Sequence, residues 1–162
     1  MKWFDWMSLA IVLGTALIQK IRTSKAGGMG LAFFEMGGLI VSAIAANALA
    51  MPLAQAIGIR HLVMLIVLFV LFVILTFVFS RWLFNLTEWS FHSLDDFFGF
   101  LWGLGAGLVI AHMVLRVIIE SQGSNGMVLP DLADAPIARE IYYFKTWNAL
   151  RSLYSRFGMD GI

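Results

Sequence analysis

The sequence predicts an all-α fold: a polytopic membrane helical bundle with four transmembrane helices and a C-terminal amphipathic helix. Apolar residues make up 60% of the 162-residue chain and charged residues only 13%, whereas globular chains contain roughly 45–50% and 25% of these classes. So few charged side chains cannot cover the surface of a water-soluble protein of this size. The apolar residues also gather in four runs of about the length that crosses a bilayer.

The four predicted spans are separated by short, more polar stretches. They cover Trp3–Ile18, Met29–Met51, Leu62–Phe79 and Phe97–Leu115. The third is the clearest, because Thr76 is its only polar residue and a helix that is apolar on every side needs lipid around it. Pro52 is expected to end the second span, since proline interrupts the hydrogen bonds of a helix interior.

The first span is followed by a short basic loop, predicted over Gln19–Gly28, which contains Lys20, Arg22 and Lys25. A signal peptide carries its basic residues before the apolar run, so we expect this first helix to be retained. Basic residues in a short loop favour the cytoplasmic side of a membrane. We therefore expect both chain termini to lie on the outer side.

We divide the chain into a four-helix transmembrane domain, residues 1–120, and a C-terminal region, residues 121–162. The C-terminal region opens with an aperiodic connector, and Asp134 and Pro136 then predict the start of a helix. Apolar side chains recur every three or four positions at Tyr143, Trp147, Leu150, Tyr154 and Phe157. We expect an amphipathic helix that lies among lipid headgroups, or that packs on the bundle or on a partner.

The most regular local patterns are two rows of small residues spaced four apart, which places each row on one face of a helix. The members are Gly99, Gly103 and Gly107 in the last span and Gly38, Ser42 and Ala46 in the second. In lipid, small residues at this spacing let two helix backbones approach closely. We expect the two rows to pack against each other, although a glycine row can also line a ligand or ion path.

Four ionisable side chains in or beside the spans are the candidate functional groups: Asp5, Glu35, Asp95 and His112. Glu35 is the only acidic residue well inside a span. An intramembrane carboxylate is costly, so Glu35 is a functional candidate, either as a proton carrier or as the partner of a cation. The structural alternative is that it pairs with a Lys or Arg near the membrane surface or is protonated. Asp5 lies near the surface, and an interfacial or capping role is expected for it rather than a buried one.

Two of these candidates belong to the last span. Ser93 and Asp96 form a capping signature at its start, which leaves the role of the adjacent Asp95 open. His112 is followed four residues later by Arg116. This spacing suits a proton relay, but a histidine hydrogen-bonded inside the bundle is the more ordinary interpretation.

No catalytic or metal-ligating set is recognisable in the sequence. It has no cysteine, and its three histidines are scattered without the spacing of metal ligands. It contains neither a glycine-rich phosphate loop nor a Gly-x-Ser-x-Gly nucleophile motif. The net charge of +1 is not that of a nucleic-acid-binding protein. We therefore expect no enzyme, cofactor, metal or nucleic acid, and we expect the lipid bilayer as the main partner.

Most of the chain resembles the colicin V production protein (CvpA) family. The best match is residues 89–107, which are similar to the family's Leu-x3-Asp-Arg-x2-Gly-x3-Gly-x2-Arg-Gly pattern. The matching residues are Phe91, at the Leu position, and Asp95, Gly99, Gly103 and Gly107. An Asp at the start of the first span (Asp5), a basic turn after it and an amphipathic tail also agree.

The chain departs from the family in its basic residues. Asp96 and Ala106 stand where the family has arginines, so an Asp95 that pairs with those arginines in relatives must find another partner here. The resemblance implies a bacterial inner-membrane protein that assists toxin production or export, or envelope homeostasis, without a settled biochemical activity. Two alternatives stay open. One is a proton- or ion-coupled channel or transporter subunit using Glu35, Asp95 and His112, and the other is an accessory subunit of a larger membrane complex or homo-oligomer.

Overall fold

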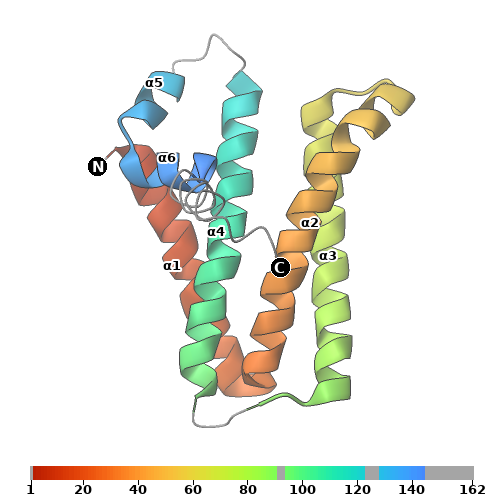
Figure 1. The fold of residues 1–162 in the computed structure, drawn as a ribbon, viewed down its shortest axis with the longest axis vertical. Coiled ribbons are helices and arrows are strands. Elements are labelled where there is room, and N and C mark those ends of the chain that lie inside the picture. Colours follow the sequence, from red (N-terminus) through yellow and green to blue (C-terminus); the bar gives the residue numbers. More distant parts are fainter. Residues whose placement is uncertain (1, 91–93, 123–127, 145–162) are drawn as a thin grey trace, which may run out of the picture.

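The computed structural model describes residues 2–90, 94–122 and 128–144, and within them the chain is helical without any strand (Figure 1). The predicted all-α class is confirmed. The long helices are α1 (Trp3–Arg22), α2 (Gly28–Ile57), α3 (His61–Thr87) and α4 (Asp95–Gln122). A π-helical turn, η1 (Thr23–Gly27), joins α1 to α2, and two short helices follow α4, namely α5 (Val128–Ala133) and α6 (Pro136–Tyr143).

The four long helices are each long and apolar enough to cross a membrane, so the chain is a multi-pass membrane protein. Each helix is longer than the apolar run that predicted it. Helix α3 carries large apolar side chains that are exposed in the isolated chain along most of its length, including Val67, Leu71, Ile74 and Val78. In a bilayer these side chains contact lipid, where exposed apolar surface carries no penalty.

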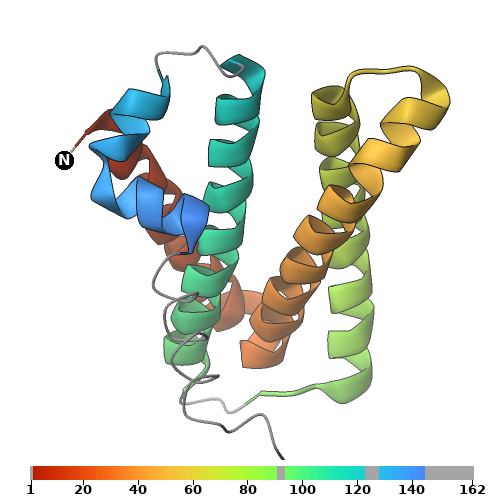
Figure 2. The same ribbon diagram turned by 45° about the horizontal axis from the view of Figure 1, so that its top comes forward.

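The bundle consists of two antiparallel helix pairs, α1 with α4 and α2 with α3, joined mainly through contacts between α2 and α4. Figure 2 shows that the pairs lie close at one end and diverge toward the other. We call the close end, which holds η1 and the α3–α4 connection, the turn end. The opposite end, where α1 begins, is the N-terminal end, and α5 and α6 lie there (Figure 1).

Two predicted helix boundaries are wrong. Helix α2 does not end before Pro52 but continues to Ile57, because a transmembrane helix tolerates proline where its neighbours satisfy the freed carbonyl groups. The helix ends instead at Gly58, whose φ of 77° suits glycine. Likewise, the predicted basic loop is helical: α1 continues to Arg22, and the Thr23 hydroxyl donates to the carbonyl oxygens of Gln19 and Lys20 at 3.0 and 2.9 Å.

The C-terminal region also differs from expectation. The predicted connector contains the short helix α5, and Pro136 begins α6 as predicted, at its first position. Helix α6 ends at Tyr143, where Phe144 adopts a left-handed conformation with φ 47°. The prediction of one uninterrupted amphipathic helix is therefore wrong at this point. The rest of the predicted stripe, residues 147–157, lies outside the described residues.

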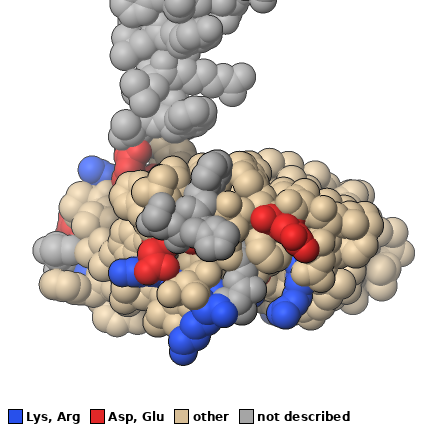
Figure 3. All heavy atoms as spheres, turned by 90° about the horizontal axis from the view of Figure 1, so that it is seen from below, with Lys and Arg blue, Asp and Glu red and all other residues tan. Residues whose placement is uncertain are grey.

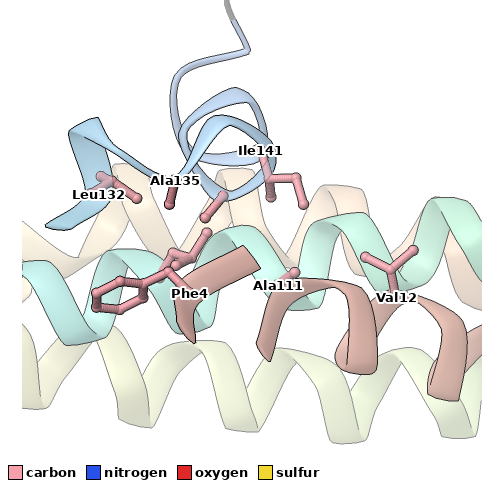
Figure 4. Packing of buried hydrophobic residues seen from close by; sticks show 8 residues of the cluster. Phe4, Val12, Ala111, Leu132, Ala135 and Ile141 are labelled. Carbon is pink, nitrogen blue, oxygen red and sulfur yellow. The ribbon is translucent and has the colours of Figure 1, made fainter. Parts of the chain in front are cut away.

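Buried apolar side chains form two clusters. The α6 cluster joins α1, α4, α5 and α6 and consists of Phe4, Val12, Ala111, Leu115, Leu132, Ala135, Ala138 and Ile141. Figure 4 shows its members on α5 and α6 directed toward those on α1 and α4. The alanine cluster lies between α2 and α3, with Met113 reaching it from α4, and consists of Ala43, Ala46, Ala50, Ala54, Met64, Leu65, Leu68 and Met113. Short side chains on α2 thus bring α3 close.

Candidate functional site

The glycine row of α4 packs against α1. A β-carbon at Gly103 would lie 2.7 Å from the Cα of Ala16, and one at Gly107 would lie 2.7 Å from the Cα of Val12. These separations are too short for any side chain, so the two backbones approach as closely as glycine permits. Gly99 continues the row and meets the Thr23 side chain.

The second small row packs elsewhere, so the expectation that the two rows meet is wrong. Gly38 faces Thr76 of α3, and the hydroxyl groups of Ser42 and Thr76 are hydrogen-bonded at 2.8 Å. Ala46 is fully buried in the alanine cluster. A small-residue face specifies close approach but does not specify a partner, and the pairing of α1 with α4 and of α2 with α3 assigns each row to its own helix.

The buried Glu35 forms an ion pair with the partly exposed Arg22 near the turn end. Its side chain is 1% exposed and accepts two hydrogen bonds from the Arg22 guanidinium, at 2.7 and 2.9 Å. The Gln19 amide group donates a third hydrogen bond to the same carboxylate. The Arg22 guanidinium also lies over the ring of Phe77, 5.6 Å from its centroid. A two-pronged arginine contact is among the strongest that a carboxylate makes, so the geometry places Glu35 with a cation.

Asp95 joins the start of α4 to the start of α2. Its carboxylate accepts a hydrogen bond from the backbone N–H of Met29 at 2.9 Å and another from the Ser90 hydroxyl. The next N–H of α2, that of Gly30, donates to the Trp89 carbonyl at 3.0 Å. A β-carbon at Gly30 would lie 2.7 Å from that carbonyl oxygen, so glycine is required here. A negative charge at the N-terminus of α2 also complements the helix dipole.

The neighbouring Asp96 is exposed in the first turn of α4. Its predicted capping partner, Ser93, lies outside the described residues. The two adjacent aspartates therefore lie in different surroundings: Asp95 is 7% exposed and faces the bundle, and Asp96 faces outward.

Asp5 is completely buried, contrary to the expectation of an interfacial position. One carboxylate oxygen accepts hydrogen bonds from the backbone N–H groups of Ile137 and Ala138, each at 3.0 Å. The other accepts the N–H of Lys2 at 3.2 Å. The N-cap residue of α6, Ala135, has no polar side chain, so Asp5 supplies from α1 the cap that α6 lacks.

His112 contacts the other end of α6. Its Nδ1 lies 3.1 Å from the carbonyl oxygen of Ile141, in the last turn of α6. The rings of Tyr142 and Phe144 lie beside the imidazole, with centroids 6.0 and 5.1 Å away. Burial raises the pKa of the Tyr142 hydroxyl above its ordinary value. Asp5 and His112 therefore hold α6 at its two ends.

The His112–Arg116 spacing does not form a relay in this arrangement. Arg116 instead pairs with Glu120 at 2.6 Å, and Glu120 also lies 3.4 Å from His61 at the start of α3. These three side chains link α4 to α3 at the N-terminal end, whereas His112 faces α6.

The four candidates form two separate groups. Glu35 and Asp95 lie toward the turn end, and Asp5 and His112 contact α6 toward the N-terminal end. Asp95 and His112 share α4, and they stand seventeen positions apart, a rise of about 25 Å along the helix. Among the described residues no group of acidic and histidine side chains is arranged to hold a metal ion. The arrangement fastens helices to one another.

Sequence reasoning missed the partners of these groups, Gln19, Arg22 and Ser90. Arg22 was noticed only as part of a basic loop. The position of Arg22 in the chain could have indicated the pairing. Two antiparallel helices joined by a short turn bring the end of the first opposite the early turns of the second, where Glu35 lies.

No protein-family model, curated protein or solved structure matches this chain.

Proposed function

We propose that this chain is a non-enzymatic protein of the bacterial inner membrane, of the CvpA type, that assists toxin production or export, or envelope homeostasis. One observation carries the proposal: Asp5, Glu35 and Asp95 are all buried and all bonded to groups of the same chain. A carboxylate that moves protons or ions must exchange partners during its cycle. A carboxylate that is hydrogen-bonded to a helix N-terminus or to an arginine instead stabilises the packing of the helices.

The residues that match the family pattern connect α4 to neighbouring helices in this chain. Asp95 binds the start of α2, while Gly103 and Gly107 admit α1. Asp95 accepts hydrogen bonds from a backbone N–H and a hydroxyl, so it does not depend on the arginines that the family pattern has and this chain lacks. This supports a role in which α4 organises the bundle, with the family's glycine scaffold kept for packing.

The role is tested by deletion in a bacterial host and complementation. We expect deletion to reduce export of a secreted peptide toxin or to increase uptake of a dye that the envelope normally excludes. Gly103→Leu should fail to complement, because the larger side chain separates α1 from α4, and Glu88→Gln, an exposed change at the turn end, should complement fully. Unchanged export and dye uptake after deletion would refute the role.

The competing transporter function has one observation in its favour. The Arg22 side chain is 39% exposed although its partner Glu35 is buried, so the ion pair is reachable from outside the helix core. Proton flux into proteoliposomes containing the full chain, followed with a pH-sensitive dye, separates the two functions. We expect flux equal to that of empty vesicles. A flux that Glu35→Gln abolishes would establish the transporter function instead.

We further propose that both termini lie outside the cytoplasm, with the turn end facing inward. The basic residues Lys20, Arg22 and Lys25 lie at the turn end, and they favour the cytoplasmic side. Because the chain has no cysteine, single cysteines report sidedness directly. In intact cells a membrane-impermeant maleimide should label Arg60→Cys and spare Lys25→Cys. The reverse labelling would invert the topology.

A further inference from the structure

We propose that a groove between α1 and α4 at the turn end binds the headgroup of a zwitterionic phospholipid that carries a primary amine, as phosphatidylethanolamine does. The groove has a volume of about 440 Å³, within the range of small-molecule sites. It is lined by Leu17, Lys20, Asp96, Phe97 and Phe100. The proposal requires only the membrane placement of the bundle and is independent of the role proposed above.

The polarity of the groove changes with depth as that of a lipid does. Lys20 stands in the last turn of α1 and Asp96 in the first turn of α4, so both charges lie at the membrane surface. Leu17 and Phe100 lie about one helical turn deeper on the same faces. Both Leu17 and Phe97 are more than half exposed in the isolated chain. A headgroup at the mouth of the groove would therefore continue into acyl chains along apolar side chains.

The two charges are available to a ligand. In the part of the chain that the structure describes, neither the Lys20 ammonium nor the Asp96 carboxylate has a hydrogen bond or an ion pair. Both side chains are exposed. The glycine contacts between α4 and α1 hold the two helices that carry them in fixed register, so the charges face a common groove without neutralising one another.

The charge pattern selects the ligand. A phosphate group would accept from the Lys20 ammonium, and a primary ammonium would donate to the Asp96 carboxylate. An anionic lipid offers only the first contact and meets repulsion from Asp96. A phosphatidylcholine headgroup has no N–H to donate. Figure 3 shows the turn end, where acidic and basic side chains are interspersed among uncharged ones instead of forming one basic patch. The ligand that satisfies both charges carries both signs.

Native mass spectrometry of the purified full chain tests the site. The protein is released from mixed micelles that contain equimolar phosphatidylethanolamine, phosphatidylcholine and phosphatidylglycerol with identical acyl chains. We expect the phosphatidylethanolamine adduct to exceed the phosphatidylcholine adduct by about fivefold, the effect of the one exposed charge-assisted hydrogen bond, to Asp96, that phosphatidylcholine cannot donate. Asp96→Asn should abolish that preference, and Lys20→Gln should weaken both adducts, because both lipids carry the phosphate.

Two matched variants provide the control. Lys25→Gln and Glu88→Gln make the same charge changes at the same end of the bundle but outside the groove, and they should keep the full preference. Because all four residues are exposed, thermal unfolding of every variant should match that of the unaltered protein. Equal binding of the three lipids would overturn the proposal. So would a preference for phosphatidylglycerol that Lys20→Gln removes and Asp96→Asn leaves intact, since that pattern belongs to a simple anion site.

Discussion

At the scale of single residues, the bundle depends on positions where a side chain would not fit and on charges that have partners. Gly103 belongs to the first class, and Gly14 provides the contrast. A β-carbon at Gly103 would collide with the α1 backbone, whereas one at Gly14 would meet nothing within 4 Å. Glycine is thus required at one helical position and merely present at the other.

This difference predicts opposite effects of the same substitution. Gly103→Ala should lower the free energy of unfolding by about 1–3 kcal/mol, because backbone has to move to accept the methyl group. Gly14→Ala should be neutral or stabilise by up to about 1 kcal/mol, since alanine favours the helix. Reversible unfolding in mixed detergent micelles measures both. Equal effects of the two changes would contradict the close α1–α4 contact.

The Glu35–Arg22 ion pair yields a second prediction at this scale. The substitution that tests it is Glu35→Gln. Because Arg22 donates two hydrogen bonds to the Glu35 carboxylate, the substitution should lower the free energy of unfolding by about 1–3 kcal/mol through the loss of these charge-assisted contacts.

A double-mutant cycle separates the pair from other effects. Glu35→Gln combined with Arg22→Gln should cost less than the sum of the single changes, since removing both charges leaves neither unpaired. Unfolding free energies of the four proteins give the coupling. Strict additivity would show that the two side chains do not interact in the membrane.

At the scale of elements, α6 is a short helix stabilised from outside itself. It has eight residues and no polar side chain at its N-cap, and a helix of this length is unstable alone in water. Asp5 on α1 satisfies its first N–H groups, and His112 on α4 contacts a carbonyl of its last turn. The α6 cluster then buries its apolar face (Figure 4).

Asp5→Ala should therefore release α6 while leaving the long helices folded. The lost cap is worth about 0.5–2 kcal/mol, a large part of what holds so short a helix. Hydrogen exchange followed by mass spectrometry should show faster exchange in residues 136–143 and little change in α3. Asp131→Ala alters an exposed acidic residue of α5 and serves as the control. Unchanged exchange in α6 would refute the capping role of Asp5.

At the scale of the whole molecule, the two helix pairs are separate packing units that meet through α2 and α4. Gly103 belongs to the α1–α4 contact and Gly38 to the α2–α3 contact. The sequence alone suggested one interface made from both rows. The structure makes two, so the bundle has two close backbone contacts instead of one.

Additivity distinguishes these arrangements. Gly38→Ala and Gly103→Ala alter separate interfaces, so their effects on the free energy of unfolding should add to within about 0.5 kcal/mol. Rows that met face to face would couple strongly, because a shift made for one methyl group would change the space available to the other. Unfolding of the two single variants and the double variant provides the measurement.

Much of the fold follows from the sequence, because lipid imposes a simple rule. A run such as Leu62–Phe79 has to be helical in a bilayer, where every backbone N–H and C=O must be bonded within the segment. The four spans and the start of α6 at Pro136 were predicted on such local grounds. Helix ends were less predictable, as Pro52 and Gly58 show, because a boundary depends on which neighbours satisfy the freed backbone groups.

The sequence by itself determined which segments lie in the membrane and which residues are small, acidic or basic. Only the tertiary structure decided what each of them touches. Asp5 meets α6 across more than 130 residues and Asp95 meets Met29 across 66. Neither contact produces a periodic pattern in the sequence, because the two partners lie so far apart along the chain. Local patterns report the preference of a segment for its solvent, whereas partners are chosen by how helices of fixed shape fit together in three dimensions.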